Sequence, residues 1–142
     1  MWLVYAIAAS ILWGLVYSLS EKIFRYDISP QTLLAAQMCL GGIIFLLFSY
    51  NTTLKKDMAL IISNHRLFII LISELVAVII ANYLISLAIQ ARDATLAGLI
   101  EQSYPIFTVF FTWVIFKESH LTAGVIIGSI MIFLGIVIMA YF

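Results

Sequence analysis

Charged residues are scarce in this chain of 142 residues, where Asp, Glu, Lys and Arg together make up 10% of the sequence and 65% of the residues are apolar. A soluble domain of this length cannot hide so much apolar surface, because its interior is too small. The seven Lys and Arg balance the seven Asp and Glu, so we expect neither a nucleic-acid partner nor an acidic tail. The composition predicts an integral membrane protein whose main surroundings are the lipid bilayer.

Cysteine and histidine are also rare. The single cysteine, Cys39, cannot form an internal disulfide bond, and no residues near it have the spacing of metal ligands. Both histidines, His65 and His120, stand in polar breaks between apolar runs, and we interpret them as solvated loop residues rather than ligands. We therefore expect no metal and no cofactor. The spans also contain no nucleophile–base pair, which argues against an enzyme.

Long apolar runs make up most of the chain. A helix needs roughly 20 residues to cross the ~30 Å hydrocarbon core of a bilayer. Five runs of about this length cover residues 2–20, 31–50, 67–89, 95–116 and 123–142. Their length favours helices over barrel strands, which alternate in polarity within segments of about ten residues. The sequence therefore predicts an all-α membrane protein with five transmembrane helices in a single domain, residues 1–142.

The first apolar run resembles a signal peptide only in its position. It has no basic segment before it and no clear small-residue cleavage site. We interpret it as a retained first span.

The basic residues hardly distinguish the two sides of the membrane. Five spans place the two termini on opposite sides, and we call the N-terminal side A and the other side B. Side A has Lys55, Lys56, Arg66 and Lys117, and side B has Lys22, Arg25 and Arg92. Cytoplasmic loops are normally the richer in Lys and Arg. Two interpretations stay open: a fixed orientation with the N-terminus inside, and insertion in both orientations.

Two carboxylates fall inside predicted spans, where each costs roughly 2.5–3.5 kcal/mol at the helix centre on insertion scales. With a rise of ~1.5 Å per residue, Glu74 lies about 10 Å from side A and Glu101 about 10 Å from side B. The same arithmetic predicts a polar layer at the height of Glu101. Its other members are Trp13, Tyr17, Gln37, Asn82 and Gln102.

Several of these residues have the chemistry of a binding site. Trp13 and Tyr17 are four residues apart and share one face of the first span, and aromatic rings beside a carboxylate attract organic cations. The competing interpretation is that Trp13 belongs to the aromatic belt of the bilayer. Pro105 is predicted to break its helix near Glu101, as in transporters that bind substrate at broken helices. We predict the polar layer as a substrate site, with Glu101 and Glu74 as proton-coupling candidates.

The last span has almost no polar side chains but contains Gly124, Gly128 and Gly135. The first two have the small-xxx-small spacing that lets helices approach closely. This spacing, which also occurs by chance, predicts a dimerisation helix.

In order and spacing these features resemble one repeat of the drug/metabolite transporter superfamily, of the EamA-like type. The similar residues are Trp13-Gly14 and Lys22 in the first span, Ser29-Pro30 before the second, and residues 99–107 with Phe116-Lys117-Glu118 in and after the fourth. The last span is also similar to the terminal dimerisation helix of the small multidrug resistance proteins. Many relatives have an arginine near the position of Gln37 or Met38, so anion binding is not carried over.

The resemblance implies a transporter of a small polar or cationic metabolite or drug, with alternating access, in a prokaryotic cytoplasmic membrane. The usual family protein has ten helices in two inverted repeats, and this chain has one. The resemblance therefore implies an antiparallel second copy, or an inverted paralogue, as partner. In such a pair Glu74 of one protomer is level with Glu101 of the other, where the two would bind a cation or share a proton. The alternative function is a non-transporting membrane subunit that stabilises or regulates a partner protein.

Overall fold

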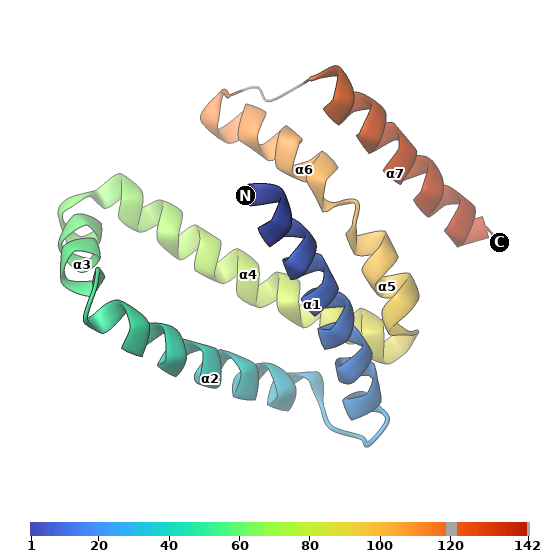
Figure 1. The fold of residues 1–142 in the computed structure, drawn as a ribbon, viewed down its shortest axis with the longest axis horizontal. Coiled ribbons are helices and arrows are strands. Elements are labelled where there is room, and N and C mark those ends of the chain that lie inside the picture. Colours follow the sequence, from blue (N-terminus) through green and yellow to red (C-terminus); the bar gives the residue numbers. More distant parts are fainter. Residues whose placement is uncertain (119–121, 142) are drawn as a thin grey trace.

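The computed structural model describes residues 1–118 and 122–141, without the side chain of Ala140, and these ranges are helical with no strand (Figure 1). The helices are α1 (Trp2–Phe24), α2 (Pro30–Tyr50), α3 (Leu54–Ser63), α4 (His65–Ala91), α5 (Ala94–Glu101), α6 (Tyr104–Phe111), a π-helical turn η1 (Thr112–Phe116) and α7 (Ala123–Tyr141). His120 and the predicted end of the last span at Phe142 lie outside the described residues.

Four segments of the described chain are long and apolar enough to cross a bilayer. They are α1, α2, α4 and Ala94–Phe116, which comprises α5, α6 and η1 in succession. The 19 residues of α7 are apolar too, but its described apolar stretch, Ala123–Met139, is shorter than the other four. The all-helical fold with several membrane-capable segments is thus confirmed, and the fifth span stays a prediction.

Polar side chains between the spans start the helices. The side-chain oxygens of Ser29, Asn64 and Asp93 each accept a backbone N–H of the following first turn, at 3.4, 3.1 and 2.7 Å. Such caps satisfy donors that have no partner inside the helix. Pro30 stands at the start of α2, where its missing N–H costs nothing.

The buried residues gather at one end of the molecule, on side B, where α1, α4 and α5 contact one another. Phe24, Ile89, Ala94 and Ala97 form the apolar cluster there, each at most 8% exposed. The other buried residues of the described chain, Ser20, Pro30 and Ser86, lie on the side-B portions of α1, α2 and α4. From this end the helices diverge toward side A (Figure 1). The helix bundle is therefore packed on side B and open on side A.

Two helical segments extend beyond the predicted apolar runs. α1 continues for one turn past Ser20, and Glu21 and Arg25 form an ion pair across that turn at i,i+4 spacing, which favours helix. The second polar break, which the sequence suggested to be a connection, contains the ten-residue helix α3. Its lysines interrupt the apolar pattern, so it does not look like a span.

The fourth predicted span is a broken helix. α5 ends at Glu101, and α6 begins at Tyr104 with Pro105 in its first turn. In a continuous helix residue 105 would donate its N–H to the carbonyl of Glu101, and proline has no N–H to donate. The interruption therefore falls directly after Glu101.

Candidate functional site

A pocket of about 760 Å³ is lined by α1, α4, α5 and the first residue of α6. α1 lines it with a row of small side chains at every fourth position, Ala6, Ser10, Gly14 and Ser18. Residues four apart share one helix face, so this row leaves space along α1 from Ala6 to Ser18. This signal is present in the sequence, but the predicted site does not include it.

Glu101 provides the negative charge of the pocket. It is half-buried, and one of its carboxylate oxygens accepts a hydrogen bond from the hydroxyl of Tyr17. The Tyr17 ring packs against Trp13, with 5.6 Å between the ring centroids and an angle of 57° between the planes. Trp13 is 51% exposed and lines the same pocket. A carboxylate and two aromatic rings therefore border one space.

Gly98 sets how closely α1 and α5 approach. A Cβ atom at this position would stand 3.0 Å from Cδ2 and 3.4 Å from Cε2 of Tyr17. Carbon atoms in ordinary contact are about 3.5–4.0 Å apart. The absence of a side chain thus makes room for the Tyr17 ring, and Glu101 follows three residues later on the same side of α5.

A second carboxylate fixes the side-B end of the pocket. Glu21 accepts the backbone N–H of Ala94, the first residue of α5, at 2.9 Å, and its other oxygen pairs with Arg25. A carboxylate at a helix N-terminus also interacts favourably with the helix dipole. Glu21 lies between the first two predicted spans, and its contact with Ala94, 73 positions away, has no local signal in the sequence.

The structure brings five of the six predicted substrate-site residues to this pocket: Trp13, Tyr17, Asn82, Glu101 and Gln102. The amide nitrogen of half-buried Asn82 donates to the carbonyl of Val78 in its own helix, at 2.8 Å, which leaves the amide oxygen for a ligand. Gln102 is exposed in the turn between α5 and α6.

Gln37 and Glu74 lie elsewhere. Gln37 is exposed on α2, and no residue of α2 is among those that line the pocket. Glu74 is exposed on α4 and has no hydrogen-bond or ion-pair partner among the described residues. Neither residue belongs to the pocket within one copy of the chain.

The family follows from comparison with known proteins. The sequence profile of the EamA-like transporter family matches residues 1–141. The chain belongs to this family. Searches among curated proteins and among solved structures found no match. EamA-like proteins are membrane transporters of the drug/metabolite type and, in general, not enzymes.

The glycines of α7 face open space in this family member. A Cβ atom added at Gly128 or Gly135 would meet no atom within 4 Å, and at Gly124 it would meet only the hydroxyl of Thr122, at 3.9 Å. The described part of the chain therefore does not use this glycine row for its own packing.

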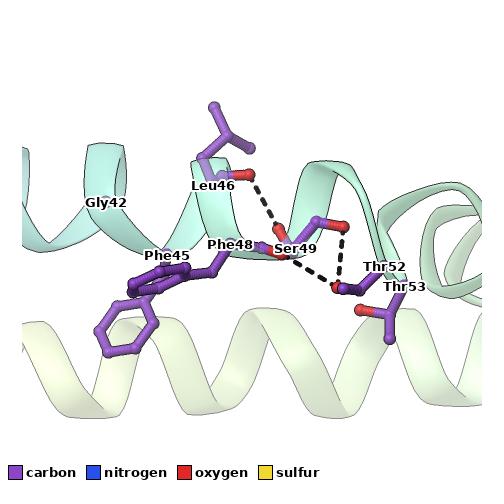
Figure 2. A pocket seen from close by; sticks show the side chains of 7 residues that line it. All are labelled: Gly42, Phe45, Leu46, Phe48, Ser49, Thr52 and Thr53. Carbon is purple, nitrogen blue, oxygen red and sulfur yellow. Dashed lines mark hydrogen bonds between the residues drawn. The ribbon is translucent and has the colours of Figure 1, made fainter.

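A second hollow of about 470 Å³ lies at the C-terminal end of α2 and in the turn after it (Figure 2). Its lining has no charged side chain. The hydroxyls of Ser49 and Thr52 donate to carbonyls of the same helix, at 3.2 and 3.0 Å. It thus offers a ligand little beyond apolar contact.

The described part of the chain contains no cluster of three or more His, Cys, Asp or Glu residues that could hold a metal ion.

Proposed function

We propose that this EamA-like protein transports small organic cations, and other small polar metabolites or drugs of that kind, by alternating access. The observation that supports this most is the position of Glu101, a half-buried carboxylate at a helix break and in one pocket with Trp13 and Tyr17. Ring faces and a carboxylate together attract a cation that also has apolar groups. Tyr17 donates to one oxygen of Glu101, and the second oxygen remains for the ligand.

Glu101 is also the proposed proton-coupling residue. A carboxylate pairs with a cation only when it is ionised, so a proton and a cationic substrate compete for it. Their alternate binding would exchange one proton for one positive charge of substrate across the membrane. Glu74 enters this scheme only if a second protomer brings it close to the pocket.

The proposed partner is a second copy in the inverted orientation, or an inverted paralogue. The chain is packed on side B and open on side A, so the closed end of an inverted copy would stand beside the open end of the first. The unused glycine row of α7 gives such a copy a surface for close helix contact. In this pair Glu74 of the partner subunit would lie level with Glu101. As its location we propose the cytoplasmic membrane of a prokaryote, as the resemblance to the drug/metabolite transporter superfamily implies.

The test is equilibrium binding of tetraphenylphosphonium, an aromatic organic cation, to the protein in lipid nanodiscs. We expect the wild type to bind it and Glu101→Gln to bind about 10–100-fold more weakly, since the attraction between two unit charges about 6–10 Å apart is roughly 2–3 kcal/mol at an effective dielectric constant of about 20. Asp57→Asn on α3 is the matched control and should bind like the wild type.

Uptake into proteoliposomes under a proton gradient then separates transport from binding. Cation-driven proton release that disappears in Glu101→Gln supports the coupling. A wild-type protein that neither binds nor transports organic cations would contradict the proposal and favour the non-transporting subunit.

A further inference from the structure

Helix α3 is held at the membrane surface by its connections. Residues 51–53 alone join it to the end of α2, and residue 64 alone joins it to the start of α4. An extended chain gains at most about 3.6 Å per residue, so α3 cannot lie more than about one helix diameter away from these ends. Both α2 and α4 are long and apolar enough to cross a bilayer. Figure 1 shows α3 beside their ends, far from the α4–α5 turn.

The side chains of α3 are divided between two faces. Leu54, Met58, Ile61 and Ile62 follow the spacing of one apolar helix face. Within that face Leu54 and Ile61 are half-buried, whereas Met58 is 46% and Ile62 77% exposed. The packing of α3 against α2 and α4 thus covers only part of its apolar face, and the rest is open to the surroundings.

The charges beside this face are mainly positive. Residues 51–66 contain Lys55, Lys56 and Arg66 against the single acid Asp57. None of the three cations has an ion-pair partner among the described residues. An amphipathic helix with free lysines and an exposed apolar edge is typical of helices that lie in the interface of anionic bilayers. In such helices, lysine stems cover apolar surface while their ammonium groups reach the lipid phosphates.

We infer that α3 is an in-plane membrane helix that binds anionic lipid headgroups through Lys55 and Lys56, with Met58 and Ile62 in the upper acyl region. The helix anchors side A of the bundle at headgroup level. Since each lysine near an anionic leaflet contributes roughly fivefold in affinity, the pair should enrich anionic lipid at α3 by about 25-fold at low salt, and less as salt rises.

The test uses the full chain with Cys39→Ser and a bimane fluorophore on Ile62→Cys, in vesicles with the same lipids in both leaflets. Symmetric leaflets make the result independent of the orientation of the protein. Quenching by brominated phosphatidylglycerol is compared with quenching by brominated phosphatidylcholine, and with quenching by iodide in the water. We expect strong quenching by brominated chains, little by iodide, and a preference for the anionic lipid. A label on Ser63→Cys, on the other side of α3, should be quenched more strongly by iodide than by the brominated lipid chains.

The variant Lys55→Gln/Lys56→Gln should lose the lipid preference, whereas Lys22→Gln, at the opposite end of the bundle, should keep it. An unchanged preference in the double variant would overturn the assignment to these lysines. A label at position 62 that iodide quenches better than brominated chains would show that α3 lies in water. One that neither quenches would show that protein covers this face, which also overturns the inference.

Discussion

The substitution Gly98→Ala tests whether the contact between α1 and α5 positions the carboxylate of the pocket. The new Cβ would stand 3.0 Å from Cδ2 of Tyr17, about 0.5–1 Å inside ordinary carbon contact. The α5 backbone is fixed nearby by the hydrogen bond from Ala94 to Glu21, whereas the Tyr17 ring borders an open pocket. The ring should therefore move rather than the helix.

A shift of this size separates the Tyr17 hydroxyl from the carboxylate of Glu101. Overpacking costs typically 1–3 kcal/mol. Because the Tyr17 ring borders the pocket and has space to move, we expect a cost near the lower end of this range. A hydrogen bond to a charged group contributes about 1.5–3 kcal/mol, and a displaced ring keeps part of it. We therefore expect tetraphenylphosphonium to bind about 5–30-fold more weakly, which corresponds to roughly 1–2 kcal/mol.

The assay is the same nanodisc titration, with Gly41→Ala as the matched control. Gly41 lies on α2, outside the lining of the pocket, and a Cβ added there would meet nothing within 4 Å. This variant makes the same change in a helix without a steric effect. The combination of Gly98→Ala with Tyr17→Phe completes a double-mutant cycle, and a shared mechanism predicts a coupling energy of at least ~0.5 kcal/mol. Binding by Gly98→Ala that equals wild type, or strictly additive effects, would refute the reasoning.

Three further experiments examine the rest of the architecture. Glu21→Gln should lower the thermal midpoint in nanodiscs, because it weakens the charged contact between α1 and the start of α5; an unchanged midpoint would show that this contact adds no stability. Gly128→Leu should leave the helix content by circular dichroism unchanged, since a side chain at this position meets nothing inside the chain. It should shift native mass spectra from dimer to monomer, and a dimer that persists would show that α7 does not form the dimer contact. In a Cys39→Ser background, cysteines at Asn51 and at Asp27 should each react with an impermeant reagent in about half of the molecules if the protein inserts both ways, whereas a label on one side only would show a fixed orientation.

Depth along a span was a good guide to the pocket, but it gives a height and no facing direction. Trp13, Tyr17 and Glu101 come together because they lie on helices that contact one another on side B. Gln37 has a similar predicted depth, yet it faces outward from α2. An amide on a nearly uniform apolar helix gives no periodic signal that would settle its direction.

The segments that sequence reasoning missed depend on long-range contacts or on mixed composition. The role of Gly98 depends on a tyrosine 81 positions earlier, and one glycine in an apolar run has no visible partner. α3 was not predicted as a helix because Lys55, Lys56 and Asp57 give this short amphipathic segment the composition of a polar loop. A search for helical spacing within the break, rather than for long apolar runs, would have found it.

The two ends of α5 show why the carboxylate occurs where it does. At the start, Asp93 and Glu21 satisfy backbone donors of the first turn, and Ala94 and Ala97 are buried against α1 and α4. At the other end α5 stops at Glu101, directly before the turn of residues 102–103, and Pro105 prevents the helix from continuing. These contacts hold α5 against α1, whereas α6, beyond the break, takes no part in them. In the proposed transport cycle, a carboxylate at this boundary would keep its contact with Tyr17 through α5 while α6 changes direction between the two sides of the membrane.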